Sequence, residues 1–168
     1  STIENKYLRV KSINIGACLH EVYDKQKKIN LILNLGPTKN YGGKNFYVGA
    51  TCGRYAGRIS NSKLNIKNKI YKLNGNEGKN TLHGGKIGFD KLEWKIHNHS
   101  KNKIIYKLLS KNLDQGFPGD LYSECIFEIK NKSLFIKYQY KSNQLTHVSL
   151  TNHSYWNLNK NKNETIFN

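Results

Sequence analysis

The chain of 168 residues is 37% hydrophobic and carries a formal net charge of +17, so it is long enough for one domain with its own core, and no apolar run approaches the roughly 18 residues of a membrane helix. Its three cysteines (Cys18, Cys52 and Cys125) form no CxxC pair, which argues against a zinc site or a disulfide framework and favours a reducing cytoplasm. The first residues contain no apolar segment with a cleavage site, so we expect a signal peptide to be absent or already removed.

Short β-strands separated by turns are predicted along the chain. From the N-terminus, strands are expected at residues 13–15, 29–35, 64–66, 70–73, 94–96, 104–109, 121–130 and 134–140. Glycine, asparagine and aspartate stand between them, and no run of apolar residues has convincing helical spacing. Many short strands with turns at regular intervals predict an all-β fold, an antiparallel β-sandwich.

The clearest strand pattern lies in the last third of the chain. Apolar or small residues alternate there with charged ones, namely Leu121, Ser123, Cys125, Phe127 and Ile129 against Glu124, Glu128 and Lys130. The same alternation returns with Leu134, Ile136, Tyr138 and Tyr140. Residues 131–133 separate the two segments and predict a hairpin turn, and residues 67–69 predict another between the strands at 64–66 and 70–73.

Two long irregular stretches, residues 36–57 and 74–88, interrupt the strands. Binding loops on a rigid β scaffold are expected in such stretches. Two arginines lie at the end of the first stretch and directly after it, Arg54 and Arg58, in a chain whose basic residues are otherwise almost all lysine. Arginine twice within five residues indicates a need for planar geometry with several donors. On a structural interpretation both pair with carboxylates at the base of the loop, and this is the interpretation we prefer for Arg54.

Two histidines have unusual sequence surroundings. His83 precedes two glycines, and His153 precedes Ser154 and the aromatic pair Tyr155 and Trp156. Histidine exchanges protons near neutral pH, paired glycines permit close approach of backbone or ligand, and an aromatic pair offers a flat apolar wall with a polar tip. Together these features predict a polar, ring-sized pocket in which protons move. The remaining histidines have no such surroundings and are interpreted as structural or exposed: His20, His97, His99 and His147.

Four sequence blocks follow one another in a specific order. They are residues 49–60 (GATCGRYAGRIS), 82–91 (LHGGKIGFDK), 116–121 (GFPGDL) and 150–158 (LTNHSYWNL). In this order they closely resemble the aldose 1-epimerase, or galactose mutarotase, family, and the resemblance covers nearly all of the chain from Asn14 onward. It implies the antiparallel supersandwich of galactose-mutarotase-like proteins.

The resemblance also concerns the extent of the domain. Members of the family are about twice as long as this chain, so residues 1–168 are expected to be the N-terminal portion of a single β-sandwich domain whose C-terminal half is absent. The family places its general-base glutamate and a substrate-binding aspartate in that half, and no carboxylate here has a matching context. We therefore expect the chain alone to be inactive.

The resemblance implies an enzyme that interconverts the α and β anomers of a free hexose such as glucose or galactose, without a metal or organic cofactor. The ring opens, C1 rotates and the ring closes, which requires an acid at the ring oxygen and a base at the C1 hydroxyl. The implied acid is His153. Arg58 and His83 are implied to hold sugar hydroxyls, and His83 also to help stabilise charge at the ring oxygen. Ser154 and Tyr155 are implied to line the same site.

One position departs from the family pattern. Asparagine often precedes the second arginine in the family, whereas Gly57 precedes Arg58 here. The change removes one hydrogen-bonding side chain near the sugar, so the sugar preference stays open.

Two other classes of function remain possible on the sequence alone. The first is a non-catalytic carbohydrate-binding module, since half a site keeps the residues that hold hydroxyls and lacks the base. The second is a nucleic-acid-binding β domain, which the positive charge favours. The lysines, however, alternate with asparagine and isoleucine along the whole chain, as an A/T-rich coding bias produces. We interpret them as a solvated surface and expect a small hexose as partner, with no nucleic acid and no membrane.

Overall fold

The computed structural model describes residues 1–43 and 47–164, and its regular structure consists of β-strands and short 3₁₀ helices. The 3₁₀ helices are Thr38–Asn40, Ser60–Ser62 and Asp114–Gly116. Within the described ranges there is no α-helix, and no helix is long and apolar enough to cross a bilayer. The predicted all-β class is confirmed.

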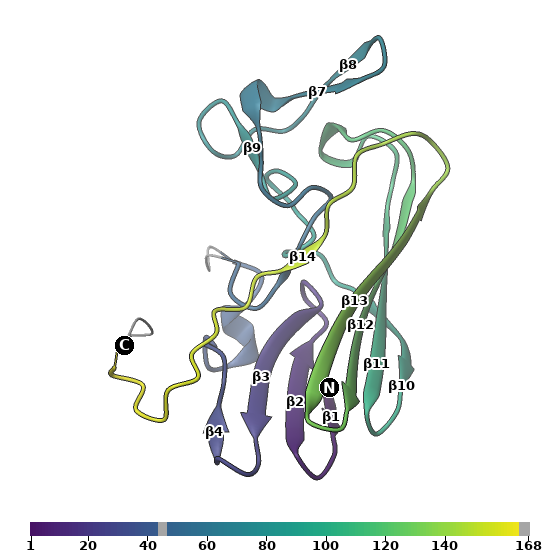
Figure 1. The fold of residues 1–168 in the computed structure, drawn as a ribbon. Helices are drawn as coiled ribbons and strands as arrows, with labels where there is room; N and C mark the ends of the chain where they lie inside the picture. Colours follow the sequence, from purple (N-terminus) through teal and green to yellow (C-terminus); the bar gives the residue numbers. More distant parts are fainter. Residues whose placement is uncertain (44–46, 165–168) are drawn as a thin grey trace.

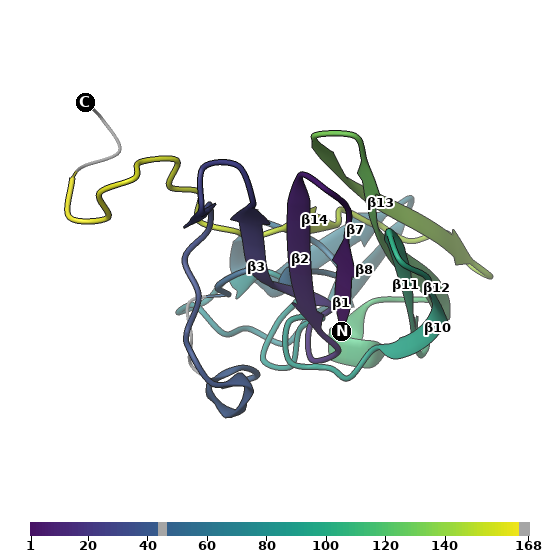
Figure 2. The same cartoon turned by 90° about the horizontal axis from the view of Figure 1, so that it is seen from below.

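Two four-stranded antiparallel sheets form the body of the fold (Figure 1). The first contains, in order, β1 (Thr2–Glu4), β2 (Leu8–Ile13), β3 (Cys18–Asp24) and β4 (Ile29–Asn30). The second contains, in order, β10 (Lys95–His99), β11 (Lys103–Ser110), β12 (Leu121–Lys130) and β13 (Ser133–Ser142). Figure 2 shows β1 beside the second sheet, and the backbone N–H of Glu4 donates to the carbonyl of Lys101 at 2.7 Å where the two sheets meet.

A hydrophobic core unites the two sheets into a sandwich. Val10 and Leu19 of the first sheet belong to the same buried cluster as Tyr106 and Phe127 of the second. A buried hydrogen bond of 2.8 Å between the hydroxyl groups of Ser12 and Tyr106 crosses from one sheet to the other. Because the inward face of each strand meets the opposite sheet, apolar and small residues recur at every second position.

The alternation predicted in the last third of the chain is confirmed on β12, whose inward residues are all buried: Leu121, Ser123, Cys125, Phe127 and Ile129. The hairpin turn follows as predicted, because Lys130 pairs with Ser133. On β13 the same side is only half-buried at Leu134, Ile136 and Tyr138 and exposed at Tyr140. This strand is the edge of its sheet, so its outer flank has no neighbour within the part of the chain that the structure describes.

The hairpin predicted around residues 67–69 is also confirmed, as β7 (Lys63–Ile66) and β8 (Lys69–Lys72). The N-terminal predictions are less accurate, since β1 and β3 were not expected and β2 was expected only at its last residue. The strand expected at 13–15 ends at Ile13, because Gly16, with a φ of +68°, turns the chain against the carbonyl of Asp90. The strand expected at 29–35 pairs regularly only at Ile29–Asn30.

Two short strand pairs connect the loops that contain the sequence blocks at residues 49–60, 82–91 and 150–158. The strand β5 (Thr51–Cys52) pairs with β14 (Thr151–Asn152), and β6 (Arg58–Ile59) pairs with β9 (Thr81–Leu82). After β13 the yellow segment of Figure 1 passes through β14 and on toward β4. Backbone hydrogen bonds of 2.9 Å, from Leu33 to Tyr155 and from Asn157 to Leu31, hold it along the first sheet. Residues 82–85 and 150–157 are thereby brought to the same 49–58 loop.

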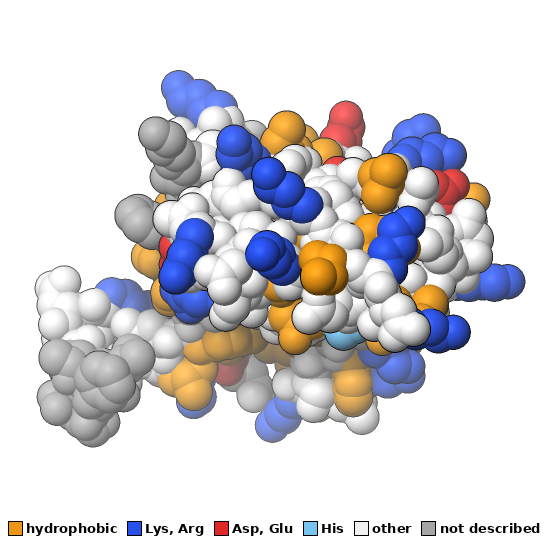
Figure 3. Space-filling model, turned by 90° about the horizontal axis from the view of Figure 1, so that it is seen from above, with side chains coloured by type: hydrophobic (Ala, Val, Ile, Leu, Met, Phe, Trp, Pro, Cys, Tyr) orange, Lys and Arg blue, Asp and Glu red, His pale blue; other side chains and the backbone are white. Residues whose placement is uncertain are grey.

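The positive charge is dispersed on the face shown in Figure 3. Lysine and arginine side chains are separated there by apolar and uncharged ones, and acidic side chains lie among them. Some lysines form ion pairs with acidic side chains, as Lys107 does with Glu124 at 3.1 Å.

Candidate active site

His83 and His153 lie side by side, although they are 70 positions apart in the sequence. Their ring centroids are 5.3 Å apart and the planes meet at 89°, edge to face. His153 follows β14, and its backbone exchanges hydrogen bonds with residues 49 and 50 beside β5, at 3.0 and 2.8 Å. His83 follows β9, and its N–H donates to the carbonyl of Gly57 at 2.9 Å, next to β6. Two short strand pairs thus bring the two sequence blocks together.

The ring of His83 is held in a defined tautomer. Its Nδ1 atom accepts a hydrogen bond from the backbone N–H of Gly57 at 3.0 Å. A neutral imidazole whose Nδ1 accepts must carry its proton on Nε2. Burial lowers the pKa of His83 below its ordinary value of 6.5, and the neighbouring His153 and Arg58 lower it further. His83 is therefore a neutral hydrogen-bond donor near pH 7.

The backbone around His83 explains the two glycines. His83, Gly84 and Gly85 all have positive φ, at 49°, 93° and 107°. A Cβ on Gly84 would lie 1.8 Å from the carbonyl oxygen of Gly53, so only glycine fits where these two loops cross. The glycine pair therefore serves a close approach of backbone to backbone, which fixes the loop that presents His83.

The side chain of Asn76 fastens the same loop. Its Oδ1 accepts from the N–H of Leu82 at 2.7 Å, and its Nδ2 donates to the carbonyls of Leu82 and Gly85 at 3.0 and 3.1 Å. Three hydrogen bonds from one side chain span the loop around His83. Asn76 therefore links the irregular stretch before β9 to the histidine.

Aromatic rings surround His153. The ring centroid of Tyr155 lies 5.2 Å from that of His153. Tyr47 lies 5.8 Å from His153 and 4.7 Å from His83, so it contacts both histidines. His153 itself is half-buried, and within residues 1–43 and 47–164 neither of its ring nitrogens has a hydrogen-bond partner. Ser154 donates its backbone N–H to Asn152 at 3.2 Å, and its buried hydroxyl has no partner among the described residues.

Arg58 reaches the site from β6, where it pairs with Leu82, the residue before His83. Its guanidinium makes a two-point ion pair with Glu77, from Nε to Oε2 at 2.6 Å and from Nη2 to Oε1 at 2.7 Å. Its side chain is 62% exposed, so the group lies at the surface beside the histidines.

Arg54 has a different role, and the expected carboxylate partner is wrong. Its side chain is 2% exposed and makes no ion pair among the described residues. The guanidinium donates instead to the Ser110 hydroxyl and to backbone carbonyls, those of Ser110, Lys111, Phe117, Pro118 and Gly119. The carbonyls of residues 110–111 and 117–119 point toward the protein interior, and the five N–H groups of the Arg54 guanidinium supply their hydrogen-bond donors. Arg54 is therefore a structural residue, as expected, with carbonyls in place of carboxylates.

A groove of about 700 Å³ lies away from the histidines, on the second sheet. Its lining includes Leu109, Tyr122 and Tyr140 together with the charged side chains of Lys107 and Glu124. None of the residues around His83 and His153 contributes to it. The chemistry-bearing groups and this groove are therefore separate features, and we place the candidate site at the histidines because proton-exchanging groups converge there.

Three residues around the histidines were not predicted from the sequence: Tyr47, Asn76 and Glu77. All three lie in the two irregular stretches that were expected to carry binding loops. No local pattern distinguishes them, because their contacts are with loops distant in sequence. Trp156, expected to form part of a flat apolar wall, is 44% exposed and pairs through its backbone with Ile32.

The sandwich and its paired histidine loops place the chain among galactose mutarotase-like folds. The crystal structure of a GalM/aldose epimerase homologue from C. elegans matches it with a TM-score of 0.87 and 29% identity over 93% of this chain and 50% of that one. Galactose 1-epimerase from Lactobacillus acidophilus NCFM matches with a TM-score of 0.84 and 31% identity over 94% of this chain and 48% of that one.

Sequence comparison gives the family. The family model described as aldose 1-epimerase matches residues 1–168, and the chain belongs to this family. It is 36% identical to galactose mutarotase of Sus scrofa over 93% of this chain and 46% of that protein. It is 35% identical to aldose 1-epimerase of Haemophilus influenzae over 94% of this chain and 47% of that protein. The chain thus spans about half the length of these relatives.

Proposed function

We propose that the protein is an aldose 1-epimerase that interconverts the α and β anomers of a free hexose, glucose or galactose. The observation that carries this proposal is the contact between His83 and His153, with centroids 5.3 Å apart, in a chain that belongs to the family. Two groups able to exchange protons lie in contact with one another, and opening and closing a sugar ring requires proton transfer at two atoms. Relatives with printed names of galactose mutarotase and aldose 1-epimerase support the reaction.

The proposed roles follow from the geometry. His153 protonates the ring oxygen when the ring opens and recovers that proton when it closes. His83 is neutral, with its proton on Nε2, and donates a hydrogen bond to a sugar oxygen as charge develops. Arg58 holds sugar hydroxyls through guanidinium N–H groups that Glu77 leaves open. Ser154 and Tyr155 line the site beside His153.

The base that removes the proton of the C1 hydroxyl is proposed to lie outside residues 1–168, which would form the N-terminal portion of one sandwich domain. Glu77 contacts the site through Arg58, which holds both of its carboxylate oxygens. A carboxylate in a two-point ion pair is a weak base, because the cation lowers its pKa.

The proposal is tested by polarimetry of freshly dissolved α-glucose and α-galactose with the full-length gene product. We expect the optical rotation to reach its equilibrium value faster than in buffer. The rate should rise with protein concentration and fall when His153 is replaced. A full-length protein that leaves the spontaneous rate unchanged for both sugars contradicts the proposal.

One observation favours a second candidate, a non-catalytic carbohydrate-binding module. Among the described residues, no carboxylate stands unpaired beside the two histidines, while hydroxyl-binding groups are present. Such a module would bind a hexose without accelerating mutarotation, so the two candidates differ in the polarimetric rate at saturating sugar. For either function we propose a cytoplasmic location, which the three free cysteines support.

A further inference from the structure

The carboxylate of Glu77 meets the guanidinium of Arg58 in a parallel fork. The two contacts, at 2.6 and 2.7 Å, use the Nε edge of the guanidinium. Both side chains are accessible to solvent, with 62% of Arg58 and 36% of Glu77 exposed. Exposed pairs add little to stability, so a two-point pair beside a candidate site calls for another explanation.

The backbone of Glu77 is fixed independently of this ion pair. Its N–H donates to the carbonyl of Asn80 at 3.2 Å, and its own carbonyl accepts from Asn80 at 2.9 Å. The preceding residue, Asn76, is hydrogen-bonded to the loop that carries His83. Glu77 therefore stands on a tight turn fastened to the histidine loop, at a defined place relative to Arg58.

A fork on the Nε edge orients the rest of the guanidinium. A free arginine side chain samples many rotamers, and a planar carboxylate partner fixes both its position and its plane. The Nη1 group and the second N–H of Nη2 make no hydrogen bond within the described residues, so they form the edge left open to a ligand. Two N–H groups on one planar edge match two neighbouring hydroxyl oxygens of a sugar.

We propose that Glu77 is a positioning residue that orients Arg58 toward adjacent hydroxyls of the hexose. This inference rests on the proposed function and adds to it the group that prepares Arg58 for binding. Glu77 acts through Arg58 and touches no reacting atom. Its negative charge also offsets the positive charge of Arg58 beside His83, because the two groups have opposite effects on that histidine.

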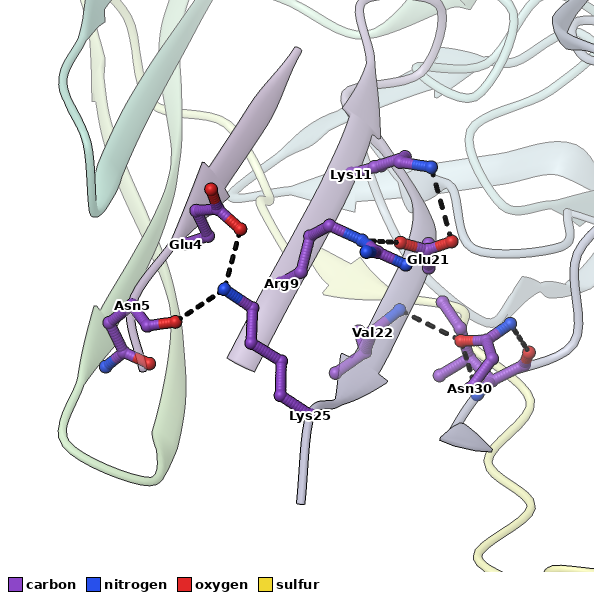
Figure 4. A network of polar contacts seen from close by, with 9 residues as sticks. Glu4, Asn5, Arg9, Lys11, Glu21, Val22, Lys25 and Asn30 are labelled. Atoms are coloured by element: carbon purple, nitrogen blue, oxygen red, sulfur yellow. Dashed lines mark hydrogen bonds and ion pairs between the residues drawn. The ribbon is translucent and has the colours of Figure 1, made fainter. Parts of the chain in front are cut away.

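The first sheet supplies a matched control. Arg9 on β2 and Glu21 on β3 form an ion pair of 2.7 Å, and Lys11 reaches the other oxygen of Glu21 at 3.4 Å (Figure 4). This is also an arginine–glutamate ion pair, with a lysine in place of the second arginine contact, and it lies on a regular sheet with no member of the candidate site. Glu21→Gln therefore measures the effect of losing an ion pair that is away from the candidate site.

The test measures mutarotation by the full-length gene product carrying Glu77→Gln, Glu21→Gln, Arg58→Ala or the double change of residues 58 and 77. We expect Glu77→Gln to raise KM about threefold to fivefold, the range typical of a surface ion pair, with little change in kcat. Glu21→Gln should change neither constant. Because Glu77 acts through Arg58, adding Glu77→Gln to Arg58→Ala should have no further effect on KM.

Three outcomes would overturn the inference: an unchanged KM in Glu77→Gln, a lower KM, or additive effects in the double variant. A lower KM would mean that the ion pair competes with the sugar, and additivity would mean that Glu77 acts independently of Arg58. If the unsubstituted protein neither binds hexose nor accelerates mutarotation, the proposed function fails and this inference fails with it. A fully active protein with a normal Glu77→Gln variant overturns this inference alone.

Discussion

The backbone N–H of Gly57 donates a hydrogen bond to the Nδ1 atom of His83 at 3.0 Å. In return, the N–H of His83 donates to the carbonyl of Gly57 at 2.9 Å. These reciprocal bonds fix both the backbone and the ring of His83 with the main chain of a residue that has no side chain. Space around Gly57 is open, since a Cβ there would meet nothing within 4 Å. The absence of a side chain at position 57 therefore changes which groups can contact a ligand. The two backbone hydrogen bonds that fix His83 do not depend on that side chain.

The first prediction concerns the protonation of His83. Its pKa is lowered in the folded state, so the unfolded chain binds a proton more readily. Stability should consequently decrease as the pH falls below about 6.5, and the decrease from this group should end below its folded-state pKa. His83→Asn removes the titration, and asparagine tolerates the positive φ at this position.

Urea unfolding between pH 5 and 7.5 checks this prediction. The difference in unfolding free energy between the unsubstituted protein and His83→Asn should depend on pH in this direction, while His20, whose pKa burial also lowers, contributes equally to both proteins. A difference that does not vary with pH would mean that His83 titrates alike in the folded and unfolded chain.

The second prediction concerns His153 in the full-length gene product. Removing a general acid slows a reaction by about 10²–10⁴-fold, so His153→Ala should reduce the mutarotation rate by this factor. His97, on β10 and exposed, is the matched control, and His97→Ala should leave the rate unchanged. Near-normal mutarotation in His153→Ala would exclude His153 as the acid.

Much of the fold was predictable because a strand buried on one side alternates apolar and polar residues along the sequence. The pattern of β12 and its turn into β13 is of this kind, and both were predicted within a few residues. The first sheet was harder, although β2 alternates too. Ser12 occupies an inward position there, and its burial depends on the hydroxyl of Tyr106 from the other sheet. A partner 94 positions away leaves no local signal.

The candidate site was predictable only where a residue type is unusual in its local context. Histidine before two glycines and arginine in a lysine-rich chain are of this kind. Glu77 is one acidic residue in a polar loop, and its fork with Arg58 exists only because the loops meet. The partners of Arg54 could not be predicted at all, since backbone carbonyls have no sequence signature.

The third prediction separates the two arginines. Arg58→Lys should lower kcat/KM about tenfold or more, the effect of losing a hydrogen bond to a charged group, and leave the unfolding free energy nearly unchanged. Arg54→Lys should instead lower the unfolding free energy by about 2–4 kcal/mol, because several buried carbonyls lose their donor. Kinetics and urea unfolding on both variants measure this contrast. Equal effects of the two substitutions on stability would contradict the assignment of separate roles.

The fourth prediction concerns the loop crossing at Gly84. Both Gly84 and Gly36 have positive φ, at 93° and 71°, so alanine is strained at either position. Only at Gly84 would the added Cβ also collide, with the carbonyl oxygen of Gly53 at 1.8 Å, whereas nothing lies within 4 Å at Gly36. Gly84→Ala should therefore cost about 2 kcal/mol more than Gly36→Ala in urea unfolding. Similar costs would show that the two loops separate easily.

The last prediction is that residues 1–168, prepared alone, leave mutarotation at its spontaneous rate. The reaction needs a base at the C1 hydroxyl, and two carboxylates considered for that role, Asp120 and Glu164, are engaged elsewhere. Asp120 accepts from the N–H of Asn112 at 2.7 Å, and Glu164 accepts from the amide of Asn161 at 3.1 Å. The edge strand β13, with Tyr140 55% exposed, should also make the isolated chain prone to associate, so light scattering must accompany polarimetry. Monomeric residues 1–168 that turn over sugar at about 1–10³ per second would place the base within this chain and contradict the proposed mechanism.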